Sequence, residues 1–301
     1  MQIQYGFRIE IECLHSTPVI TMLDIYPADR TDAGLADPMQ AFSLATGELV
    51  TGMSLYLDAF GNLCRRIIAP AGGLRIEGQG MMFNSGTPDR VNLSARAQPP
   101  EKLPDATLQF LLGSRYCETD LLSNFAWNQF ASIPRGWELV RAICDFVHNH
   151  IRFDYALARN TRTAAEGFAE KVGVCRDFAH LAITLCRCMN IPARYCTGYL
   201  GDIGVPKVPE PMDFSAWFEV FLDDEWWTFD ARHNAPRIGR MVIARGRDAA
   251  DVPIVNSFGP HTLRRFDVIT DEIEVDPRVQ MPHLPPAGQT GEAGARSGQA
   301  A

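Results

Sequence analysis

The sequence lacks any long uninterrupted apolar run. Its longest apolar stretches fall well short of the roughly 18 residues that a helix needs to cross a bilayer. We also expect no secretory leader, because residues 2–13 read QIQYGFRIEIEC, and this alternation of apolar and polar residues predicts a half-buried strand. We therefore expect a cytoplasmic protein that has no membrane partner.

Basic charge is scarce as well. Only 28 lysines and arginines stand against 36 aspartates and glutamates, which gives a net charge of −8. Such a chain repels polyanions unless it carries a local basic cluster, so nucleic acid is not an expected partner. The contents of 46% hydrophobic and 21% charged residues are those of an ordinary globular protein, and the length allows about two domains.

The cysteines lack the spacing of a disulfide or metal framework. The sequence has no CxxC pair, and its eight cysteines lie at positions 13, 64, 117, 144, 175, 186, 188 and 196. Cys186 and Cys188 cannot bind one ion, because residues two apart on a helix point about 200° away from each other. No Asp-rich loop of calcium-binding spacing is present either. We expect free thiols, no metal and no cofactor.

Two halves of different character follow one another along the chain. Residues 1–110 contain strand-like segments between Gly, Pro, Asp and Asn turns, which predict an N-terminal β-sandwich domain. Residues 111–275 form the second predicted domain, with helices at 119–131, 136–154, 163–171 and 175–190 and strands after them. Residues 276–301 have almost nothing to bury, so we predict a disordered tail.

A hairpin is predicted after the fourth helix. The segments DFSAWFEVFL and EWWTFDA flank Asp223-Asp224, which suits a two-residue turn. The resulting register pairs Leu222 with Glu225, Val220 with Trp227, Trp217 with Asp230 and Ser215 with Arg232. Ser215 and Asp230 then lie on one face of the sheet as diagonal neighbours.

The segment GVCRDFAH places Cys175 at the predicted start of a helix. Backbone N–H groups and the helix dipole would stabilise a thiolate there, and the same N–H groups suit an oxyanion. The alternative is a buried structural thiol, because free cysteine is among the most buried residue types. Asp230 is likewise either an orienting carboxylate or an acidic strand end. His148, His150 and His180 fit surface or packed histidines.

Two stretches together resemble the core of the transglutaminase-like superfamily. They are TAAEGFAEKVGVCRDFAHLAITLCRCMNIPARYCTGYL and SAWFEVFLDDEWWTFDA, within a resemblance that runs from about residue 115 to 236. The resemblance implies an α+β fold with a papain-like core, a helix bundle packed on an antiparallel sheet, after a β-sandwich like that of bacterial transglutaminase-like proteins. It also implies that Cys175 attacks amides of a protein or peptide substrate, that a thioester passes to an amine or to water, and that Asp230 orients the base.

The histidine that the family uses as base falls on Ser215. A hydroxyl cannot take a proton from a thiol near neutral pH as an imidazole can. Another histidine could replace it, the thiolate could work unaided at a reduced rate, or the chain could be a non-catalytic module that binds peptides or proteins. His233 is the nearest candidate in sequence, but the register directs it to the face opposite Asp230. It reaches Cys175 only if the strand ends before it and the chain curls back.

Overall fold

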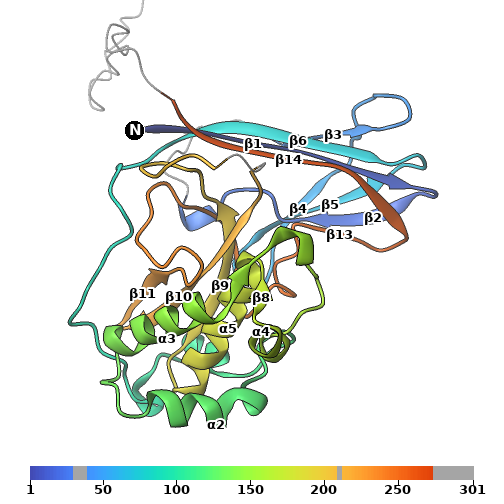
Figure 1. The fold of residues 1–301 in the computed structure, drawn as a ribbon. Coiled ribbons are helices and arrows are strands. Elements are labelled where there is room, and N and C mark those ends of the chain that lie inside the picture. The colour runs from blue at the N-terminus through green and yellow to red at the C-terminus, as the bar shows by residue number, and fades with distance from the viewer. Residues whose placement is uncertain (30–38, 209–211, 274–301) are drawn as a thin grey trace, which may run out of the picture.

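The computed structural model describes residues 1–29, 39–208 and 212–273. A β-sandwich lies above a region of helices packed on a second β-structure, as Figure 1 shows. This arrangement confirms the predicted α+β class, with helices packed on an antiparallel sheet after an N-terminal β-region. The predicted disorder of residues 276–301 lies outside the described residues. Within the described ranges, no helix is both long enough and apolar enough to span a membrane.

The sandwich consists of two antiparallel four-stranded sheets. One has the order β14-β1-β6-β3, with β1 at Gln2–Cys13, β3 at Met39–Ser43, β6 at Leu74–Phe83 and β14 at His261–Ile273. The other has the order β13-β2-β5-β4, with β2 at Thr17–Thr21, β4 at Ser54–Leu57, β5 at Leu63–Ala69 and β13 at Val255–Ser257. Ile3, Ile9 and Ile11 of β1 are buried, which confirms the strand predicted from the alternating start of the chain.

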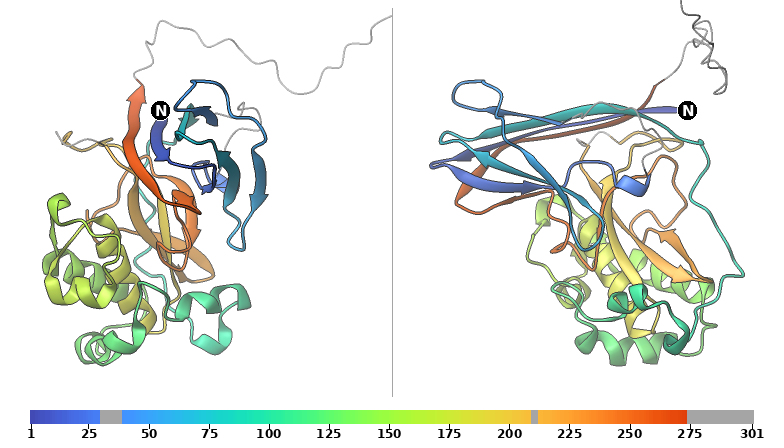
Figure 2. Two further views of the ribbon diagram at one scale, coloured as in Figure 1. Left: turned by 90° about the vertical axis from the view of Figure 1, so that its right-hand side faces the viewer. Right: turned by 180° about the vertical axis from the view of Figure 1, so that it is seen from behind.

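The sandwich draws strands from both ends of the chain. Strand β14 pairs antiparallel with β1 along its whole length, from Gln2 opposite Ile273 to Cys13 opposite His261, and β13 pairs with β2. Figure 2 shows these late strands beside the early ones. The division expected from the sequence placed residues up to 275 with the second half. A period of two residues identifies a strand but carries no information about its partner.

The second region packs helices on a sheet of order β11-β10-β9-β12. Its helices are α1 (Asp105–Leu108), α2 (Thr119–Phe130), α3 (Trp137–His150), α4 (Ala164–Glu170) and α5 (Cys175–Cys188). Its strands are β9 (Ala193–Tyr199), β10 (Ser215–Leu222), β11 (Glu225–Phe229) and β12 (Met241–Gly246), and a small parallel pair joins β7 (Arg152–Phe153) to β8 (Val172–Gly173). Helix α5 contacts α2, α3 and α4 as well as β9 and β10, so it lies between the other helices and the sheet.

The predicted hairpin is confirmed where its two strands pair. Asp223 and Asp224 have φ angles of 47° and 62°, which is the left-handed conformation that a tight hairpin turn requires. Leu222 pairs with Glu225, and the ladder ends at Phe218 opposite Phe229. The strand β11 therefore ends one residue before Asp230, and the pairs predicted beyond this point do not form.

Candidate functional site

Cys175 is the first residue of α5, as the sequence predicted. The side chain of Asp177 caps this end of the helix, because it accepts a 2.8 Å hydrogen bond from the Val174 N–H and a 3.1 Å bond from Arg162. Gly173 makes room for this cap, since a Cβ atom built there would lie only 2.6 Å from the Asp177 carboxylate. The sequence Gly-Val-Cys-Arg-Asp thus fixes where the helix begins and where the thiol stands.

The thiol of Cys175 lies at the start of strand β10. The residue is half-buried, and burial raises the pKa of its thiol to about 11. Arg232 and the backbone N–H of Ala216, which donates a hydrogen bond to the sulfur, act in the opposite direction. The sequence suggested a stabilised thiolate. In the structure the loss of water around the sulfur outweighs the groups that favour the anion, so the resting thiol carries its proton.

Asp230 and His233 form a hydrogen-bonded pair directly after β11. The Nδ1 atom of His233 lies 2.8 Å from Oδ2 of Asp230, while Oδ1 of Asp230 accepts the backbone N–H groups of Arg232 and His233. The carboxylate therefore organises a tight turn, and this turn carries His233 back toward its own partner. Strand β11 ends before His233, and the imidazole lies against Asp230 instead of on the opposite face that the predicted register gave it, because the ladder stops at Phe229.

Arg240 is a member of this site that the sequence analysis missed. Its guanidinium donates to Oδ2 of Asp230 at 2.9 Å and to Asp89 at 2.9 Å. Burial opposes a charge on Asp230, yet Arg240 and the hydrogen bonds from His233 hold the pKa of this carboxyl well below its usual range. Asp230 is thus a carboxylate at neutral pH. Arg240 reaches Asp230 only because the loop between β11 and β12 folds back, and no periodic pattern in the sequence predicts this contact.

Helix α3 clasps the turn that bears His233. Nδ1 of His148 lies 2.9 Å from the carbonyl oxygen of Arg232, and Oδ1 of Asp145 accepts a 2.7 Å hydrogen bond from the Asn234 side chain. Asn234 has a φ angle of 52°, a left-handed conformation that asparagine tolerates better than most residues. His148 therefore contacts the site through backbone atoms.

Ser215 stands at the start of β10, next to Ala216. It is 6% exposed, and its hydroxyl has no hydrogen-bond partner among the described residues. A cleft of about 600 Å³ opens beside it, lined by Ser215, His233, Arg232, Asp213, Phe153 and Arg152 among others. Burial raises the pKa of the Asp213 carboxyl. The cleft thus presents an imidazole and charged side chains next to the strand that contacts Cys175.

The single histidine of α5, His180, is packed. His180 is fully buried, stacks on Tyr116 and accepts a hydrogen bond from the N–H of Ala249. Burial lowers the pKa of its imidazole well below the usual value.

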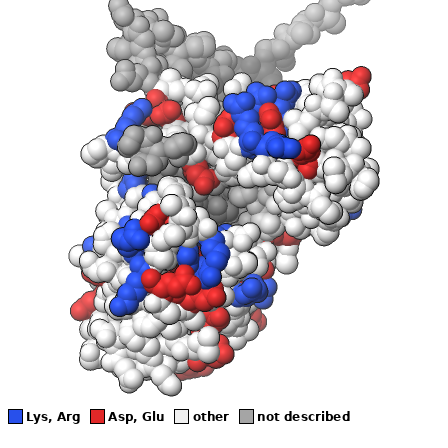
Figure 3. Space-filling view, turned by 45° about the vertical axis from the view of Figure 1, so that its right-hand side comes forward, with Lys and Arg blue, Asp and Glu red and all other residues white. Residues whose placement is uncertain are grey.

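All eight cysteines, each within the described part of the chain, are free. No group of three His, Cys, Asp or Glu side chains in the described residues is arranged to hold a metal ion. On the face in Figure 3, basic and acidic side chains lie beside one another.

Comparisons with known proteins identify a family for the core of the chain and relatives for more of its length. Residues 124–231 match the model of the transglutaminase-like superfamily. An uncharacterised protein of Mycobacterium tuberculosis is 28% identical over 243 residues, which cover 73% of this chain and 76% of that protein. An uncharacterised protein of Mycobacterium leprae is 33% identical over 104 residues, which cover 33% of this chain and only 37% of that protein.

A solved structure extends the likeness beyond this core. It is that of a proposed cysteine protease from Cytophaga hutchinsonii, which matches with a TM-score of 0.71 and 26% identity over 92% of both chains. The likeness therefore includes the sandwich as well as the helices and their sheet. Residues 124–231 thus form a core domain of the transglutaminase-like superfamily, within a chain whose whole fold is similar to that of the proposed cysteine protease.

Proposed function

We propose that the protein is a cysteine-dependent amide hydrolase or acyl transferase that acts on protein or peptide amides. Cys175 is the nucleophile, His233 the base and Asp230 the orienting carboxylate. The observation that carries the proposal is the 2.8 Å bond between Nδ1 of His233 and Asp230, made beside a cleft that His233 and Ser215 both line. His233 thus supplies the imidazole that position 215 lacks.

The hydrogen bond to Asp230 selects one form of the imidazole. Because Asp230 is ionised and can only accept, Nδ1 of a neutral His233 carries the proton. The other nitrogen, Nε2, then holds a lone pair, and it has no hydrogen-bond partner among the described residues. This is the arrangement that a general base requires.

The reaction starts from a protonated thiol, since the pKa of Cys175 is about 11. Nε2 of His233 takes the thiol proton as the sulfur attacks the amide carbonyl carbon. The oxyanion faces the first N–H groups of α5, which have no acceptor within the helix. The C–N bond breaks, the leaving amine receives the proton from His233, and a thioester remains. Water or a second amine then attacks the thioester, His233 removes its proton, and the proton returns to the departing sulfur.

A substrate-independent experiment tests the base. Alkylation of Cys175 by iodoacetamide at pH 7.5, followed by peptide mass spectrometry, reports how readily the thiol loses its proton. We expect His233→Gln to slow this reaction at least about tenfold, because general-base assistance contributes about 10²–10⁴-fold to proton transfer. The matched control is His15→Gln, since His15 is exposed and lies in the sandwich. An unchanged rate in His233→Gln contradicts the assigned base.

The second candidate function is binding without catalysis, which Ser215 favours. On that account the cleft holds a peptide and Cys175 forms no thioester. Incubation of the full chain with a glutamine-containing peptide and hydroxylamine distinguishes the two, because an acyl enzyme yields a hydroxamate. Hydroxamate formation that disappears in Cys175→Ala supports the enzyme. Peptide binding with no product in the wild type, and product only in Ser215→His, supports the binding module.

A further inference from the structure

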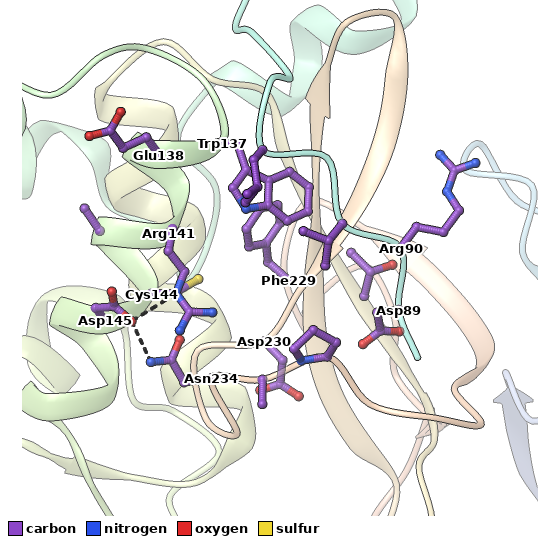
Figure 4. A pocket seen from close by; sticks show the side chains of 16 residues that line it. Asp89, Arg90, Trp137, Glu138, Arg141, Cys144, Asp145, Phe229, Asp230 and Asn234 are labelled. Atoms are coloured by element: carbon purple, nitrogen blue, oxygen red, sulfur yellow. Dashed lines mark hydrogen bonds and ion pairs between the residues drawn. The ribbon is translucent and has the colours of Figure 1, made fainter. Parts of the chain in front are cut away.

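A second pocket lies on the other side of the turn that carries His233. It has a volume of about 530 Å³, within the range of small-molecule sites. Three parts of the chain that are distant in sequence form its walls: α3, the end of β11 with residues 234–236, and the segment 89–93 that leaves the sandwich. Figure 4 shows the Trp137 and Phe229 rings between these walls.

The interior of this pocket is apolar. The ring centroids of Trp137 and Phe229 are 4.5 Å apart, and both side chains line the pocket. Val91 and Leu93 also line the pocket, and they are 53% and 78% exposed. An apolar group placed between these side chains would remove their surface from water, which favours binding.

Among the charged side chains that line the pocket, Arg141 is the one available to bind a ligand. Asp89 and Asp230 are both held by Arg240. In Figure 4, Arg90 and Glu138 point away from the rings, whereas Arg141 extends along α3 toward Asp145 and Asn234. Arg141 makes an ion pair of 3.2 Å through Nε with Oδ1 of Asp145, and its guanidinium has no hydrogen bond to any other described residue.

We propose that this pocket binds a carboxylate attached to an apolar, ring-sized body. The body packs on Trp137 and Phe229, and the carboxylate pairs with the free N–H groups of Arg141, whose planar fork matches a carboxylate. The proposed catalytic step is not needed for this binding.

One contact between the pocket and the turn of His233 is made through Oδ1 of Asp145. Oδ1 of Asp145 contacts Arg141 and also accepts the side-chain N–H of Asn234, whose backbone N–H bonds Asp230. A ligand carboxylate on the free N–H groups of Arg141 places a second negative charge beside Asp145 and weakens the attraction between the guanidinium and Oδ1, so the contact of Oδ1 with Asn234 also changes. Occupancy therefore alters how His233 is positioned.

Calorimetric titration of the full chain with 3-phenylpropionate tests the site. The neutral 3-phenylpropanamide and the cationic 3-phenylpropylammonium have the same body. We expect the carboxylate to bind at least about tenfold more tightly than either, and Arg141→Gln to abolish this preference, because a charge-assisted hydrogen bond is lost. Ala142→Phe, which fills the pocket from α3, is an independent variant that should also prevent binding.

Arg152→Gln is the matched control, because Arg152 lines the catalytic cleft instead. The proposal is overturned if the cation or the amide binds as well as the carboxylate, if none binds at millimolar concentration, or if Arg152→Gln rather than Arg141→Gln removes binding.

The connection between the pocket and the turn of His233 is tested by iodoacetamide alkylation of Cys175. The alkylation rate should change at least about twofold when the ligand is added to the wild type, and it should not change in Arg141→Gln. Binding without that change contradicts the connection but leaves the proposed catalytic residues untouched.

Discussion

Asp230 bonds His233 and Arg240 through the same carboxylate oxygen. The arginine keeps the carboxylate ionised in a buried place, and the ionised carboxylate keeps the imidazole oriented. Arg240 itself is buried and lies over the Trp217 ring at 5.0 Å. At the scale of single residues, the site therefore depends on one buried carboxylate with two partners.

Replacement of this carboxylate tests its role in orienting the base. In Asp230→Asn the amide presents a donor as well as an acceptor, so the preferred imidazole tautomer is no longer fixed. We expect alkylation of Cys175 to slow at least about tenfold, and the free energy of unfolding to fall by about 3–5 kcal/mol because Arg240 loses a buried partner. Asp120→Asn, in the first turn of α2, serves as the control and should change neither quantity.

The same carboxylate predicts a dependence of stability on pH. Its pKa is lower in the folded chain than in the unfolded one, where an aspartate has a pKa of about 3.9. The folded state is therefore stabilised above that value, and the stabilisation is lost as the pH falls below it, by up to about 1.4 kcal/mol per pH unit. Urea unfolding at pH 7 and pH 3 should show a smaller loss in Asp230→Asn than in the wild type. Equal losses would contradict this assignment.

At the scale of elements, the start of α5 positions the Cys175 thiol, and the clasp from α3 positions the turn of His233. The cap by Asp177 requires that residue 173 have no side chain. In Gly173→Ala the Asp177 side chain must shift, and we expect a loss of about 1–3 kcal/mol in the free energy of unfolding. Gly167→Ala is the control in α4, because its added Cβ meets its nearest neighbour at 3.7 Å, an ordinary contact, and alanine favours the helix by up to about 1 kcal/mol.

The clasp from α3 predicts an effect on reactivity without a large effect on stability. His148 is exposed and bonds only backbone oxygens of the turn. In His148→Ala we expect alkylation of Cys175 to slow several-fold, because the turn that carries His233 is less restrained, while the free energy of unfolding changes by less than about 1.5 kcal/mol. Asn149→Ala alters the same exposed end of α3 without touching the turn. Equal rates in the two variants would speak against the clasp.

At the scale of the whole molecule, the two regions are joined by a chain that leaves the sandwich after β6 and returns to it at β13. Val268 of β14 is buried and pairs with Phe7, whereas its neighbour Ile269 is 50% exposed. We expect Val268→Asp to lower the free energy of unfolding by at least about 3 kcal/mol, because a charge is buried without a partner. Ile269→Asp should change it by no more than about 0.5 kcal/mol. Similar effects would show that β14 contributes no core to the sandwich.

The local patterns of the sequence determined much of this protein. The alternation in residues 2–13, the helix start at Cys175 and the Asp223-Asp224 turn each depend on residues within a few positions of one another, and local backbone chemistry decides them. The resemblance carried by the same segments identified the family and placed Cys175 and Asp230 in one core.

Only the tertiary structure decided which strand pairs with β1, that the Cys175 thiol keeps its proton, and that Arg240 belongs to the candidate site. Each depends on residues brought together from distant parts of the chain, and the balance between burial and charge is set only when they meet. The position of His233 lies between these cases. The turn after Phe229 is local, but contacts from α3 and Arg240 stabilise the position in which the imidazole meets Asp230. Both partners are distant from the turn in the sequence, because other helices and strands lie between it and α3, and a loop lies between it and Arg240.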